Sequence, residues 1–73
     1  MTVGQKMHQT LATLEGCAAN LKAFALDSQD KTAQQMFNTL SGQVESVCNS
    51  LKGRINHIEQ QEPQYKTQQH PQH

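Results

Sequence analysis

The chain has 73 residues, of which 34% are hydrophobic, and its aromatic residues are two Phe and one Tyr. A chain of this length forms at most one small domain, and so small a core usually needs support from disulfides, a metal or oligomerisation. Six basic and six acidic residues give a formal net charge of zero. Without a net positive field there is little attraction for phosphates, which argues against a nucleic-acid-binding protein.

The first predicted element is a helix over residues 3–26. Its apolar residues recur at steps of three and four, which is typical of an amphipathic helix with one apolar stripe. Gly16 interrupts this pattern at a cost of about 1 kcal/mol relative to Ala. It either allows close helix packing or is tolerated on an exposed face, and the same alternatives apply to Gly42 in the next helix. The stripe consists of Val3, Met7, Leu11, Leu14, Ala18, Leu21 and Ala25.

The second predicted element follows a tight turn at about residues 27–28. Asp27 or Ser28 can cap the new helix, and Asp30 suits the positive end of the helix dipole. We expect this helix to cover residues 29–62, because Pro63 disfavours helical geometry in the residue before it. Its apolar stripe consists of Ala33, Phe37, Leu40, Val44, Val47, Leu51, Ile55 and Ile58.

So short a turn forces the two helices to run antiparallel, and the predicted fold is an all-α two-helix hairpin over residues 1–66. Residues 67–73 are expected to form a mobile polar tail, because they contain nothing to bury. The longer second helix is expected to overhang the first, leaving Ile55 and Ile58 without a partner in the chain. We therefore expect a homodimeric four-helix bundle. Its expected core residues are Leu11, Leu14, Leu40, Val44, Ile55 and Ile58.

No group of residues predicts catalysis. A catalytic nucleophile needs a neighbouring base, and a two-helix hairpin offers no pocket of catalytic volume, so we expect a non-enzymatic protein without a cofactor. The alternative is a small metal-binding or thiol-active protein. Its candidate ligands are Cys17, Cys48, His8, His57, His70 and His73. Metal sites need clustered ligands, whereas the two cysteines lie singly on different helices, which favours buried thiols and solvated histidines.

The N-terminus predicts a cytoplasmic protein. Its first eight residues lack the apolar run and the cleavage site of a secretion signal, and no stretch approaches the roughly 20 apolar residues that span a bilayer. We expect no direct membrane insertion and two reduced thiols. A turn centred between residues 27 and 28 would set residues whose numbers add to about 55 level with each other. Cys17 and Cys48 would then lie about 15 Å apart along the axis, too far for an intrachain disulfide.

Several short motifs are similar to those of one protein family. They are Met1-Thr2-Val3-Gly4, Thr10-Leu11-Ala12, Phe24-Ala25-Leu26, Ser28-Gln29-Asp30 and Glu62-Pro63-Gln64-Tyr65-Lys66. Through them the chain resembles, over residues 1–66, the short uncharacterised proteins of spore-forming Gram-positive bacteria known as domain of unknown function 1657. The tail over residues 67–73 departs from the family pattern.

The resemblance implies a setting and no reaction. Members of that family are encoded near genes for spore-membrane channel components of the kind that move dipicolinic acid, and they are associated with sporulation. The expected function is thus that of a structural or adaptor protein in the cytoplasm, forespore or spore. Its expected partners are a second copy of itself and a spore-membrane-associated protein. Tyr65, in the closing motif, either docks a partner or caps the bundle.

Overall fold

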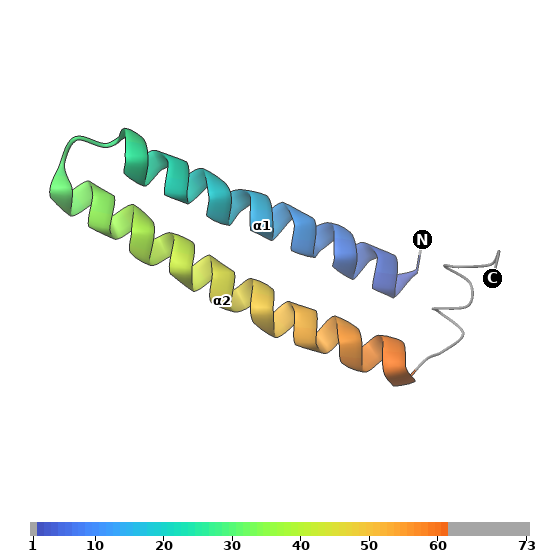
Figure 1. Cartoon of the computed structure of the whole chain (residues 1–73). Helices are drawn as coiled ribbons and strands as arrows, with labels where there is room; N and C mark the ends of the chain where they lie inside the picture. The colour runs from blue at the N-terminus through green and yellow to red at the C-terminus, as the bar shows by residue number, and fades with distance from the viewer. Residues whose placement is uncertain (1, 62–73) are drawn as a thin grey trace.

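The structure, a computed structural model, describes residues 2–61. Two helices, α1 (Val3–Asp27) and α2 (Lys31–Gln61), lie side by side and antiparallel, with residues 28–30 between them (Figure 1). The predicted helical hairpin is confirmed, and the described residues contain no strand. The predicted helix end at Glu62, Tyr65 and the tail over residues 67–73 lie outside the described residues.

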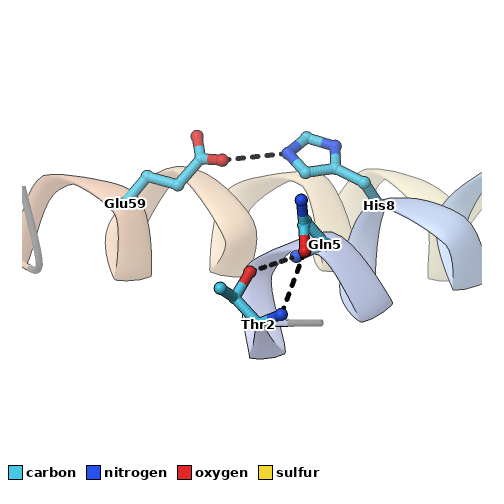
Figure 2. Close-up of polar contacts among 4 residues, drawn as sticks. All are labelled: Thr2, Gln5, His8 and Glu59. Atoms are coloured by element: carbon cyan, nitrogen blue, oxygen red, sulfur yellow. Dashed lines mark hydrogen bonds and ion pairs between the residues drawn. The ribbon is translucent and has the colours of Figure 1, made fainter. Parts of the chain in front are cut away.

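A capping box starts α1. The hydroxyl oxygen of Thr2 accepts a hydrogen bond from the backbone N–H of Gln5 at 3.1 Å, and the side-chain oxygen of Gln5 accepts one from the backbone N–H of Thr2 at 3.0 Å (Figure 2). This reciprocal pair satisfies backbone donors that have no partner within the helix. The Met1-Thr2-Val3-Gly4 opening therefore includes a helix start signal.

The cap of α2 is Asp30, and the predicted cap at Asp27 or Ser28 is wrong. The two carboxylate oxygens of Asp30 accept hydrogen bonds from the backbone N–H groups of Thr32 at 3.4 Å and Ala33 at 3.3 Å. Asp27 is instead the last residue of α1. Because Asp30 is the residue whose side chain reaches the free N–H groups, α2 begins at Lys31, two residues later than predicted.

Ser28 ends α1 rather than starting α2. Its backbone N–H and its hydroxyl both donate hydrogen bonds to the carbonyl oxygen of Phe24, at 3.0 and 2.9 Å. The side-chain amide of Gln34 donates to the Ser28 carbonyl oxygen at 2.6 Å and so ties the linker to the first turn of α2. The linker is held by these contacts at both of its ends, which fixes where each helix begins and ends.

The buried residues recur every seven positions. They are Gly4, Leu11, Ala18 and Ala25 in α1 and Ser41, Cys48 and Ile55 in α2. A seven-residue spacing is typical of coiled-coil packing, and small residues at most of these positions allow the two backbones to approach closely. The apolar core consists of Leu11, Cys48 and Ile55, with Met7, Leu14, Val44 and Leu51 packed against it.

The register of the helices differs from the predicted one by about one helical turn. The hydroxyl of Ser41 bonds to the carbonyl oxygen of Ala18, so residues whose numbers add to about 59 lie level with each other. The difference arises because the linker is centred on Gln29 instead of lying between residues 27 and 28. In this register Ile55 belongs to the core cluster with Leu11 and Cys48, and only 2% of Ile55 is exposed. The prediction that Ile55 lacks a partner in its own chain is therefore wrong.

Candidate functional site

Two rows of apolar residues lie on one side of the hairpin. In each helix, the residue three positions after a buried residue lies on the same side as the residue one position before that buried residue. This is because each residue adds about 100° of rotation about the helix axis. In an antiparallel pair these rows from both helices share one side of the hairpin. We call this surface the apolar face. It consists of Val3, Met7, Leu14, Cys17, Leu21, Phe24, Phe37, Leu40, Val44, Val47, Leu51 and Ile58.

The row formed by residues one position before a buried residue is the outer row of the apolar face, and it is exposed in the hairpin. Half of each of Val3, Phe24 and Val47 is accessible, at 53%, 50% and 53%. Near the turn, the rings of Phe24 and Phe37 contact edge to face, with their centroids 5.6 Å apart. Single exposed apolar residues are common on proteins, but apolar residues gathered on one surface mark interaction sites, and this row is interrupted only by Thr10 and Arg54. The apolar face is therefore the first candidate site.

We call the row of buried contacts between α1 and α2 the seam. Ion pairs line the edge of the seam opposite the apolar face, where the residues four positions after the buried ones lie. Three of them connect the helices, His8 to Glu59 at 2.9 Å, Lys22 to Glu45 at 2.9 Å and Glu15 to Lys52 at 3.3 Å. Figure 2 shows the first of them, in which the imidazole Nε2 of His8 faces a carboxylate oxygen of Glu59. The two residue numbers in each pair add to 67, so a single alignment of the two helices forms all three pairs. Exposed pairs of this kind add little stability, but they disfavour a slipped alignment.

A groove of about 430 Å³ opens on this ion-paired side, and we call it the charged groove. The prediction that the hairpin offers no pocket of catalytic volume is therefore wrong, because ligand sites have volumes of about 300–1,000 Å³. Small residues form its floor and the charged side chains form its rim. Its lining residues are Glu15, Ala18, Ala19, Lys22, Glu45, Cys48, Asn49 and Lys52. Two Lys and two Glu neutralise each other in pairs, so the groove has no net charge with which to select a cation or an anion. Its one buried titratable group is the thiol of free Cys48, which is 4% exposed.

The six predicted dimer-core residues separate into two groups. Leu11 and Ile55 are buried between α1 and α2, where a second chain cannot reach them. The other four lie on the apolar face, where Leu40 is 37% exposed and the rest are half-buried. This second group is Leu14, Leu40, Val44 and Ile58. The prediction omitted the outer-row residue Phe24, which lies one position before the buried Ala25.

The candidate metal ligands do not come together. Only 4% of Cys48 is exposed inside the seam, whereas Cys17 lies exposed on the apolar face. His8 is engaged by Glu59. Within residues 2–61, no three side chains of the metal-binding types form a group that could hold an ion. His70 and His73 lie outside the described residues.

Neither helix, over the residues that the structure describes, combines the length and the hydropathy needed to cross a membrane. A family model described as "Protein of unknown function (DUF1657)" matches residues 7–55. The matched range contains all residues that line the charged groove and most of the apolar face. No curated protein and no solved structure matches the chain.

Proposed function

The chain belongs to the DUF1657 family of proteins of unknown function, and from this premise we propose that it is a non-enzymatic helical interaction protein whose working unit is a homodimer. The observation that carries the proposal is the apolar face, which the hairpin leaves uncovered along both helices. A second copy of the hairpin would cover that face and complete a four-helix bundle.

The small core of the hairpin supports self-association. Among residues 2–61 the buried apolar residues are Leu11, Ala18, Ala25, Cys48 and Ile55, and two of these five are alanines. Chains of this length often need oligomerisation to supplement so small a core, which supports a contribution from the half-buried residues of the apolar face through a partner.

The setting follows from the resemblance to proteins of spore-forming bacteria. We propose that the homodimer acts as an adaptor or packing protein in the cytoplasm or forespore of a sporulating cell. Its further partner is proposed to be a spore-membrane-associated protein, with Tyr65 of the closing motif as a docking residue. An affinity purification from sporulating cells, with Tyr65→Ala as the control bait, tests this partner, since loss of the same protein from the control supports docking through Tyr65.

Sedimentation velocity over nanomolar to micromolar protein concentrations tests the homodimer. The expected result is twice the chain mass at micromolar concentration, with helical circular dichroism that weakens as dilution produces the monomer. Helix content falls with dissociation because tertiary packing supplies most helix stability. A monomer that remains fully helical at micromolar concentration contradicts the proposal.

A metal-binding or thiol-active function is the other candidate class, and no feature of the described residues favours it. Cys17 and Cys48 differ in exposure and lie on different faces, and His8 is already bonded to a carboxylate. Metal analysis of the purified full chain after dialysis separates the two functions. Stoichiometric zinc or copper would support the alternative and would point to ligands beyond residues 2–61.

A further inference from the structure

We call the end of the hairpin that contains residues 28–30 the turn end, and the other end the open end. We infer that two copies pack with their apolar faces together and with their turn ends at opposite ends of the bundle. The charged groove then stays open on both outer surfaces. This inference rests on the proposed homodimer and specifies its interface. The alternative homodimer would meet through the charged grooves, whose paired Lys and Glu residues are also able to form contacts between copies.

The size of the apolar face fits a stable dimer. The 25 residues of α1 extend about 38 Å at 1.5 Å per residue, and two adjacent helices are together about 20 Å wide. The resulting footprint is on the order of 750 Å², close to the roughly 800 Å² that each partner contributes to a standard interface. The face also meets the compositional requirement, since the centres of such interfaces are depleted in charged residues.

Charge distinguishes the two sides of the hairpin. Six of the residues four positions after the buried ones are already paired across the seam, so docking there would remove two Lys–Glu ion pairs and the bond between His8 and Glu59 from water. The two rows of the apolar face contain one charged residue, Arg54, which lies at their open end. An apolar partner surface would therefore be covered at lower desolvation cost on the apolar face than on the charged groove.

The distribution of charge along the hairpin favours opposite turn ends. Five charged residues of the described part of the chain take no part in the three ion pairs. The turn end has Asp27, Asp30 and Lys31, and the open end has Lys6 and Arg54. Among residues 2–61, the turn end thus carries net negative charge and the open end net positive charge. Two hairpins with their turn ends together would place like charges side by side. Both orientations bury the same apolar face, so even a small electrostatic difference selects between them.

Steric bulk favours the same orientation. The edge-to-face pair of Phe24 and Phe37 makes the turn end of the apolar face thick, whereas Val3 and Met7 lie at its open end. With turn ends opposite, each aromatic pair packs against the slimmer end of the other copy. Layers of even thickness pack without voids, which interiors require.

Thiol labelling at two positions of α1 tests which face is buried. Cys17 lies on the apolar face, and Ala19, two residues later, lines the charged groove. We would measure the rate of maleimide labelling of the wild-type chain and of Ala19→Cys in a Cys17→Ala background, over the concentration range in which sedimentation shows dimer formation. Cys48 is 4% exposed and gives only a slow background in both proteins. We expect labelling at position 17 to slow several-fold as the dimer forms and labelling at position 19 to stay constant.

The outcomes separate this interface from the homodimer itself. Protection at position 19 with constant labelling at position 17 would show a dimer through the charged grooves and overturn the inference while the homodimer stands. A dimer that protects neither position would also overturn it. If sedimentation shows only monomer over the whole range, the proposed function fails together with the inference.

A distance between copies tests the orientation. A nitroxide is attached to His57→Cys in the Cys17→Ala background, so each copy carries one label about 11 residues from the middle of α2. If the turn ends lie at opposite ends, the two labels are about 22 residues apart, which is about 33 Å along the axis. Turn ends placed together would leave only the width of the bundle, about 20 Å. A pulsed electron paramagnetic resonance distance near the shorter value would overturn the orientation.

Discussion

The hydroxyl group of Ser41 donates a hydrogen bond to the carbonyl oxygen of Ala18, 3.0 Å away on the other helix. Ser41 is completely buried, and no buried side-chain nitrogen or oxygen within residues 2–61 lacks a partner. A slip of the helices would leave this hydroxyl without an acceptor, at a cost of about 1–3 kcal/mol. The bond therefore stabilises the register in which Leu11, Cys48 and Ile55 form the buried core.

Replacing Ser41 tests this role. Ser41→Ala should lower the free energy of unfolding by about 1 kcal/mol, because it removes one buried hydrogen bond. Ser41→Leu should lower it by about 1–3 kcal/mol or more, because the added volume forces the closely spaced helices apart. Urea unfolding followed by circular dichroism at fixed protein concentration measures both. Ser46→Ala, at an exposed position of α2, is the control and should change little. An unchanged midpoint for Ser41→Ala would contradict the role.

A charge on the apolar face should break the homodimer. Val47 is 53% exposed in the hairpin, so Val47→Asp leaves the seam intact but places a carboxylate in the proposed interface. Burial of an unpaired charge costs several kcal/mol, and about 3 kcal/mol corresponds to a more than hundredfold weaker dimer. Sedimentation equilibrium gives the dissociation constant. The matched control is Asn49→Asp, which adds the same charge to the charged groove. Equal dissociation constants for the two variants would contradict the prediction.

Two helix glycines should be replaceable with a gain in stability. A Cβ atom added at Gly16 or at Gly42 would meet no atom within 4 Å, so neither glycine is required for close packing in the hairpin. Gly16→Ala and Gly42→Ala should each raise the free energy of unfolding by about 0.5–1 kcal/mol through helix propensity. Thermal unfolding of the single and double variants measures the gain, with Ala12→Gly expected to show a loss of similar size. Destabilised alanine variants would indicate a contact to a partner at these sites.

The ion pairs along the charged groove should contribute little stability. Lys22 and Glu45 are 58% and 49% exposed in their side chains, where solvent screens their attraction. A double-mutant cycle of Lys22→Ala and Glu45→Ala should give a coupling energy of about 0.2–1 kcal/mol that decreases as salt is added. Urea midpoints at low and high salt provide the data. A coupling well above this range that is insensitive to salt would indicate a buried pair instead.

The two cysteines should not form a disulfide within one chain. Both cysteines are free in the structure, and Cys48 is buried between the helices whereas Cys17 is exposed on the apolar face. A disulfide requires Cα atoms about 4.4–6.8 Å apart, and Cys48 is also shielded within the seam. After oxidation, intact mass analysis without reducing agent should therefore show no monomer that is lighter by two hydrogens, which is the mass change of a disulfide within one chain. An internally crosslinked monomer would contradict the observed register.

Local patterns in the sequence are enough to predict that the chain forms two antiparallel helices. Apolar residues at steps of three and four specify an amphipathic helix whatever the helix packs against, and a linker of a few polar residues has no other way to connect two such helices. The exposed position of most polar residues follows from the same periodicity. These are local properties, which depend on residues close together in the chain.

Which apolar residues the hairpin buries and which it leaves exposed follows from the packing of the two helices. That division depends on the register, and the register depends on where Asp30 caps α2 and where Ser41 finds its acceptor. A shift of one helical turn moved Ile55 from a predicted overhang into the core. A stripe of apolar residues is wider than one helix contact can cover, so spacing in the sequence does not show which part of it faces the neighbouring helix. Contacts between residues far apart in the chain make that choice.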